Sequence, residues 1–295
     1  MEIKLNLISY PLAVLLALGS GIGFAINDSV TKLKIKGNSS MSLTFLSLVF
    51  GLPIIFISLL LPLGKLTVTL NSLIFFLLAG IINFTIGRSS LYASISRLSS
   101  SGGSILTSTS ALFGFLMGWI LLDEKVTIAM AIGVVLIMIS VYVASGGFKN
   151  NLSLTGILFG LIAGLSIAIA VVLIKLGDQE GGQPVLGTLI AYLSGIAFSY
   201  IGFKRNPIKL IELRKIAIPL AIMGTSAAAG QIMRYIALLT AEASVVAPLQ
   251  NIRPVVATFI LLAFGMGEDK RPKKRHWIAA VLATIGAALV SIKYV

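Results

Sequence analysis

The sequence predicts an all-α protein that crosses a membrane about ten times. Three observations carry this prediction: 57% of the residues are hydrophobic, only 11% are charged, and long apolar stretches recur along the whole chain. A helix needs roughly 20 apolar residues to cross about 30 Å of hydrocarbon, so ten crossings use about 200 residues. The 295 residues therefore leave short connections between the crossings and no separate soluble domain.

Each predicted helix is an apolar run that ends near Lys, Arg, Pro, Asn or Gly. The ten runs cover residues 9–31, 41–63, 71–96, 101–122, 126–146, 152–175, 185–203, 215–239, 243–265 and 276–293. The weakest separations fall at 99–103 and 240–242, where one longer helix is the alternative. Strands are not expected, because ten-residue alternating segments are absent and an open sheet cannot span lipid.

The residues that build catalytic and metal sites are scarce. The chain has no Cys and a single His, His276, which excludes disulfides, thiolate sites and His clusters. It also lacks paired membrane carboxylates and a Gly-Lys-Ser/Thr phosphate loop, which argues against an enzyme and against an ATP-driven pump. We therefore expect no catalytic residue, no metal and no cofactor.

The chain repeats itself at a constant offset. Four residues of the first half find an identical residue 143 positions later, in the pairs Gly21 and Gly164, Lys32 and Lys175, Gly87 and Gly230, and Tyr92 and Tyr235. This offset predicts two repeats, 1–148 and 152–295, of five helices each. Because five is odd, the second repeat enters the membrane in the opposite sense. Inverted repeats support transport, since two similar halves can open a midplane site to each side in turn.

Two longer stretches carry a family resemblance. The first runs from Gly87-Arg-Ser-Ser-Leu-Tyr-Ala93 through Leu122-Asp-Glu124, and the second from Gly230-Gln-Ile-Met-Arg-Tyr-Ile236 through Met266-Gly-Glu268. On these stretches the chain resembles the drug/metabolite transporter superfamily, specifically its ten-helix EamA-type members. The sequence departs from the family pattern at Asp123, where a Gly is usual, and lacks the Trp-Gly of the first helix. The resemblance implies a carrier for amino acids, other metabolites, nucleotide sugars or sugar phosphates.

Polar residues at membrane depth predict a central cavity bounded by helices three, four, eight and nine. They recur at spacings of three and four, so those on one helix share a face. Pro254 opens the backbone of the ninth helix, which lipid tolerates only where the backbone faces protein or a wet cavity. We expect eight residues to bind the substrate: Arg88, Tyr92, Ser108, Gln231, Arg234, Tyr235, Asn251 and Arg253.

Three of these residues are arginines, and a charge at the bilayer centre costs at least about 2.5–3.5 kcal/mol. The acidic residues near membrane depth are Asp28 and Glu242, so the empty cavity is expected to be positive and to suit a carboxylate or phosphate. Two structural alternatives stay open, in which Asp28 pairs with Arg88 or Glu242 pairs with Arg234. Both acids are also candidates for coupling transport to an ion such as H+.

Together these features predict a secondary-active transporter of the plasma membrane that works by alternating access. Its expected partners are the lipid bilayer and a small anionic or zwitterionic metabolite, with export of an amino acid as the first candidate. The alternative is a membrane binding or structural subunit without flux. The net charge of +13 does not indicate nucleic acid, because the basic residues collect in loops that meet lipid head groups.

The distribution of these basic residues predicts the orientation of the chain. Ten crossings place most of them, including those of the loop at 270–275, on the side opposite both termini. The positive-inside rule then puts both termini outside the cytoplasm. A terminal reporter that fluoresces only in cytoplasm should stay dark, and a bright signal would contradict this orientation.

Overall fold

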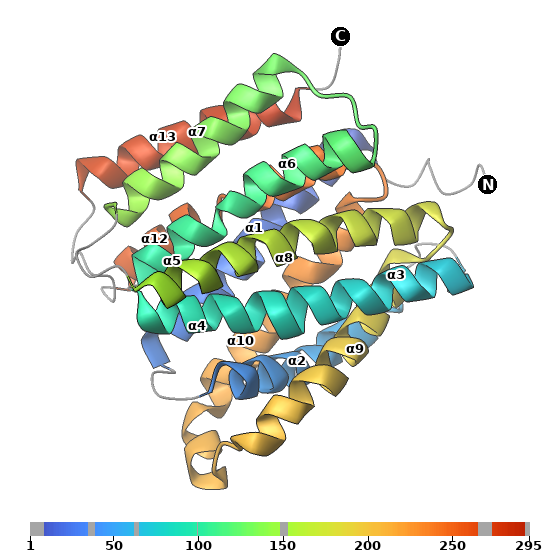
Figure 1. Cartoon of the computed structure of the whole chain (residues 1–295), viewed down its shortest axis with the longest axis vertical. Coiled ribbons are helices and arrows are strands. Elements are labelled where there is room, and N and C mark those ends of the chain that lie inside the picture. The colour runs from blue at the N-terminus through green and yellow to red at the C-terminus, as the bar shows by residue number, and fades with distance from the viewer. Residues whose placement is uncertain are drawn as a thin grey trace.

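The computed structural model describes residues 9–34, 39–61, 65–98, 100–147, 153–264 and 273–292. The first half contains α1 (Tyr10–Lys34), α2 (Ser40–Ser58), α3 (Leu70–Gly80), the π-helix η1 (Ile81–Arg88), α4 (Ser89–Arg97), α5 (Ser100–Thr107), α6 (Thr109–Leu121) and α7 (Ile128–Ser145). The second contains α8 (Leu154–Gln179), α9 (Pro184–Arg205), α10 (Leu210–Ala237), α11 (Ala243–Gln250), α12 (Arg253–Ala263) and α13 (Lys274–Ser291). Figure 1 shows one bundle, with α7 and α13 along one margin and α2 and α9 near the other.

In the described residues these helices make ten crossings. The run α3–η1–α4 forms one crossing, and so do the pairs α5–α6 and α11–α12. Eight stretches are long and apolar enough to span a bilayer, a shorter apolar helix covers Ile105–Leu121, and α13 supplies the tenth crossing. The alternative of one long helix through 240–242 is wrong, because α10 ends at Ala237 and α11 begins at Ala243.

The two halves pack as related copies. Helix α1 lies against α10 as α8 lies against α3 and α4, and α2 lies against α10 as α9 lies against α3. Three contacts join equivalent crossings of the two halves, namely α2 with α9, α6 of the fourth crossing with α11 of the ninth, and α7 with α13. The predicted fold class, an all-α membrane protein with ten transmembrane helices in two inverted five-helix repeats, is confirmed. The expected join near 149–151 lies outside the described residues.

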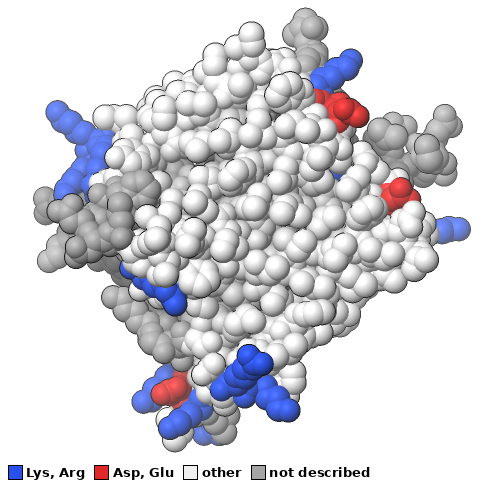
Figure 2. Space-filling model, in the orientation of Figure 1, with Lys and Arg blue, Asp and Glu red and all other residues white. Residues whose placement is uncertain are grey.

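The surface matches a bilayer. Figure 2 shows Lys and Arg gathered at the edges of the molecule, with a broad uncharged face between them. Large apolar side chains are exposed along the crossings, among them Ile128, Leu154 and Ile218. An exposed apolar band of this extent is stable in lipid and not in water.

Two helices are broken at equivalent positions. Helix α5 gives way to α6 at Ser108, and α11 gives way to α12 at Asn251 and Ile252; Ser108 and Asn251 are 143 residues apart. Pro254 lies in the first turn of α12 and has no N–H to donate. Inverted-repeat carriers use such interrupted helices to form substrate sites, because the half-helix ends present free backbone groups.

The turn between α10 and α11 is held from two sides. The Glu124 carboxylate accepts hydrogen bonds from the N–H groups of Ala243 at 2.6 Å and Ser244 at 2.7 Å, at the start of α11. The Lys175 Nζ donates to the carbonyls of Leu238 at 2.7 Å and Ala241 at 2.9 Å. The sixth helix was expected to end at Lys175, but α8 continues past it to Gln179. First-repeat and second-repeat residues thus fix this turn together.

Asp123, the departure from the family pattern, has a positive φ of 50°. This left-handed conformation favours Gly, and Asp is among the few residues that tolerate it. The family preference for Gly at this position therefore follows from the backbone. Glu268, the expected counterpart of Glu124, lies outside the described residues.

We expect Glu124→Gln to destabilise the protein by about 1–2 kcal/mol, because Gln replaces a charge-assisted acceptor pair with one neutral oxygen and an NH₂ group. Thermal unfolding in detergent measures this change. The exposed neighbouring variant Asp123→Asn is the control and should match the unaltered protein. Equal melting temperatures for both variants would contradict the role of Glu124.

Candidate functional site

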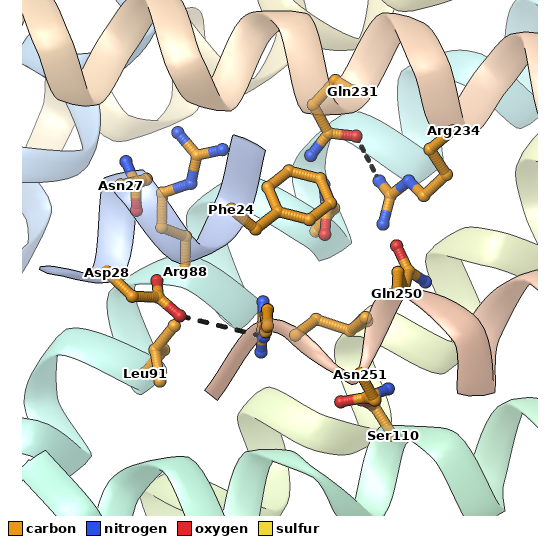
Figure 3. Close-up of a pocket in the computed structure, with 13 residues that line it drawn as sticks. Phe24, Asn27, Asp28, Arg88, Leu91, Ser110, Gln231, Arg234, Gln250 and Asn251 are labelled. Carbon is orange, nitrogen blue, oxygen red and sulfur yellow. Dashed lines mark hydrogen bonds and ion pairs between the residues drawn. The ribbon is translucent and has the colours of Figure 1, made fainter. Parts of the chain in front are cut away.

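A pocket lies between the two repeats, at the crossings that contain α1, η1 and α4, α6, α8, α10 and α11–α12. It is lined by Phe24, Asn27, Asp28, Asn83, Arg88, Leu91, Ser110, Ile167, Gln231, Arg234, Gln250, Asn251 and Arg253. Most of these side chains are polar or charged although they lie at membrane depth (Figure 3). Helices one and six join the four helices that the sequence predicts around a cavity.

The pocket lies where the repeats are related to each other. Eight of its residues form pairs at the 143-residue offset, which are Phe24 with Ile167, Arg88 with Gln231, Leu91 with Arg234, and Ser110 with Arg253. Equivalent positions meet only near the axis that exchanges two repeats. A site on this axis can be approached in the same way from either side, as alternating access requires.

Five of the eight expected site residues line this pocket, namely Arg88, Gln231, Arg234, Asn251 and Arg253, and Asp28 lines it as well. Their binding of a substrate stays a prediction. The other three lie outside the lining. Ser108 sits at the break between α5 and α6, where its hydroxyl donates to the Ile105 carbonyl at 2.6 Å.

The two expected tyrosines are buried behind the pocket. The Tyr92 hydroxyl donates to the Asn27 Oδ1 at 3.5 Å, so Tyr92 supports a residue that lines the pocket. Tyr235 packs against Phe76 with ring centroids 5.9 Å apart. The helical spacing placed both tyrosines on the polar face, but it did not resolve how deeply each side chain is covered.

The three arginines have different partners. Arg88 Nη1 donates to the Ser47 Oγ at 3.2 Å, and its guanidinium lies 4.8 Å from the centre of the Phe84 ring. Arg234 Nη2 donates to the Gln231 Oε1, and its guanidinium lies 5.7 Å from the Phe24 ring centre. Arg253 Nε lies 3.8 Å from Asp28 Oδ2. Only Arg253 therefore meets a carboxylate among the described residues.

Neither expected charge pair is formed. Asp28 pairs with Arg253 rather than with Arg88, because the break in the ninth crossing brings Arg253 to α1. Arg234 bonds to Gln231, one turn earlier on its own helix. Glu242 cannot continue the face of Arg234, because α10 ends before it and Glu242 precedes α11. The turn between α10 and α11 and the break between α11 and α12 explain why neither pair forms. Helical spacing alone reveals neither feature.

The pocket is positive. Arg88 and Arg253 lie close enough to Arg234 to repel it electrostatically. Among the described residues that line the pocket, Asp28 is the one carboxylate. Three guanidinium groups against one carboxylate leave two positive charges at membrane depth, where each must be offset by protein dipoles, water or a ligand.

The pocket is narrow and more open on one side. Its volume is about 30 Å³, which is room for about two water molecules. Asp28, Arg88 and Arg253 keep 7–9% of their surface exposed, whereas Arg234 keeps 1%. Because Asp28 lies toward the end of α1 and Arg234 toward the end of α10, the opening faces away from the termini. A metabolite fits only when the halves separate further.

Sequence reasoning missed several polar residues of the pocket, chiefly Asn27, Asn83, Ser110 and Gln250. The repeat offset contains a signal for Ser110, which lies 143 residues before Arg253. Ser110 and Asn251 bond to each other at 2.9 Å and tie α6 to the break in the ninth crossing. The Asn27 side chain donates to the Met223 carbonyl at 3.1 Å. This contact joins α1 to α10, and the spacing of residues within one helix cannot predict it.

We expect Asp28→Asn to destabilise the protein by about 3–5 kcal/mol, because it leaves the Arg253 charge buried without its carboxylate. The double change Asp28→Asn with Arg253→Gln removes both charges and should recover most of this loss. Thermal unfolding of the two single variants and the double variant measures the coupling. Additive losses would show that the ion pair contributes nothing.

The geometry agrees with comparisons to known proteins. A family model described as the EamA-like transporter family matches residues 11–146 and again 154–292. The fold of one crystal structure matches with a TM-score of 0.78 at 15% sequence identity, covering 96% of this chain and 98% of that one. No curated protein matches the sequence.

The likeness to the crystal structure shows the fold, and the two matches to the family model show the family. Members of this family are transporters rather than enzymes. The chain is a multi-pass protein of the plasma membrane. It belongs to the EamA-like transporter family, within the drug/metabolite transporter superfamily.

Proposed function

We propose that this transporter is a secondary-active carrier that moves a small anionic or zwitterionic metabolite by alternating access. The observation that carries the proposal is the excess of positive charge in the pocket between the repeats, where the partners of Arg88 and Arg234 in the described part of the chain are neutral. Arginine binds carboxylates and phosphates through two parallel hydrogen bonds, so these groups are the ligands that such a pocket favours. Export of an amino acid is the first candidate among such substrates.

Three further features support transport rather than static binding. The contacts of the two repeats are equivalent, so the halves can exchange conformations at little cost. The crossings beside the pocket are interrupted at equivalent positions, Ser108 and Asn251. The pocket is too narrow for a metabolite, so substrate has to enter and leave by a rearrangement of the bundle.

One observation favours the alternative, a membrane binding or structural subunit without flux. Each arginine of the pocket already has a protein partner, and Asn251 and Ser110 hold the two repeats together. In that case the polar groups serve only to hold the helices together. Counterflow in proteoliposomes separates the two functions, because only a carrier accumulates labelled external substrate against an unlabelled internal pool of the same solute. Pools of amino acids and of organic acids are the first to test.

We expect Arg234→Gln to weaken substrate binding tenfold to a hundredfold, since it removes a charge-assisted pair worth roughly 1.5–3 kcal/mol. The apparent affinity in counterflow measures the change. Arg97→Gln is the matched control, because Arg97 also lies over an aromatic ring but is exposed at the end of α4. Equal affinities in both variants would remove the support for Arg234 as a substrate contact.

A further inference from the structure

We propose that the pocket takes a two-ended dianion, a short molecule with one anionic group at each end. This inference rests on the proposed function and narrows its substrate class. Figure 3 shows Arg88 and Arg234 on opposite sides of Phe24, so the two guanidinium groups without a carboxylate partner lie at different ends of the pocket. Each end requires its own anionic group.

The charges of the pocket set the charge of the ligand. The Asp28 carboxylate and the Arg253 guanidinium offset each other. Arg88 and Arg234 remain, and no other carboxylate lines the pocket in the part of the chain that the structure describes. A zwitterion leaves both charges in place and a monoanion leaves one, whereas a dianion neutralises the pocket. Neutralisation matters because an unpaired charge is costly at membrane depth.

The Arg234 end has hydrogen-bonding groups that the protein leaves unused. Arg234 Nε and both polar atoms of the Gln250 amide are buried and have no hydrogen-bond partner. The two side chains are 1% and 3% exposed, and Figure 3 shows them at the same end of the pocket with Gln231. A buried donor without a partner costs about 1–3 kcal/mol, so the two N–H donors of this set, Arg234 Nε and Gln250 Nε2, are arranged for an acceptor that arrives from outside. A carboxylate supplies two acceptor oxygens for these donors.

The Arg88 end can receive a second anionic group. Arg88 uses Nη1 for the Ser47 hydroxyl, and a guanidinium has five N–H donors, so several remain. Asn27 and Asp28 lie on this side of Phe24 (Figure 3), and Asp28 is paired with Arg253. Phe24 lies between the two guanidinium groups (Figure 3), and the pocket is also lined by the apolar residues Leu91 and Ile167. Two anionic ends joined by a short carbon chain match two arginines on either side of an aromatic ring.

A dianion with both charges on one group fits the pocket less well. Arg88 and Arg234 are held by different helices, η1 and α10, and lie on opposite sides of Phe24 (Figure 3). A single phosphoryl group would meet one of them and leave the other without an anionic partner. Methyl phosphate therefore serves as a dianion of the wrong shape, and alanine as a zwitterion.

The test uses the full-length carrier in proteoliposomes. Counterflow is measured with succinate, with its monoamide succinamate, which has one charged end and nearly the same shape, and with methyl phosphate and alanine. We expect succinate to be preferred over succinamate on the order of tenfold, and methyl phosphate and alanine to compete weakly. Arg88→Gln and Arg234→Gln should each reduce the preference to about one, whereas Arg97→Gln should keep it. Arg234→Lys, which keeps the charge, should restore part of it.

The change of preference distinguishes ligand contact from a structural role, because a damaged fold lowers transport of all solutes alike. Equal transport of succinate and succinamate would overturn the two-ended dianion. Transport of alanine without succinate would also overturn it and would leave the proposed carrier function intact. Absence of counterflow with all four solutes and with amino acid pools would overturn both.

Discussion

The arrangement of this protein depends on the cost of burying positive charge in a membrane. The guanidinium groups of Arg88, Arg234 and Arg253 lie at membrane depth, and a single carboxylate, Asp28, faces them in the pocket. Such charges persist only where dipoles, aromatic rings or a ligand compensate them. The neighbouring residues follow this constraint, since Ser47, Gln231 and the rings of Phe24 and Phe84 surround the two arginines that have no carboxylate.

The two repeats share a backbone plan but divide the chemistry between them. At three of the four paired positions of the pocket one repeat carries a charge and the other a neutral residue, as with Arg88 and Gln231 or Ser110 and Arg253. Duplicated charges at such positions would face each other across the axis and repel. The symmetry of the fold therefore suits the proposed exchange of conformations. The asymmetry of the side chains lowers the cost of burying charge in the membrane.

The sequence predicted the backbone better than the pairing of side chains. Hydropathy and one constant offset yielded ten crossings, inverted repeats and five of the thirteen residues that line the pocket, because these depend on local periodicity and on duplication. The partner of Asp28 depends on how α1 is rotated and on where α11 ends, which local spacing does not contain. For a related reason, helical spacing did not predict that Tyr92 and Tyr235 are buried outside the pocket lining, since a residue on a polar face can still lie behind its neighbours.

On the side of the two termini, the bundle is held closed by contacts at the turn between α10 and α11. Glu124 and Lys175 bind the turn between α10 and α11, and in the proposed alternating access both contacts have to break before this side opens. A ligand shifts such an equilibrium only through a difference in its affinity for the two states. In the proposed mechanism an anion between Arg88 and Arg234 supplies this difference, because it neutralises the two guanidinium groups when the halves close around it. The empty pocket has no equivalent compensation, so its passage through a closed state costs more than that of the loaded carrier.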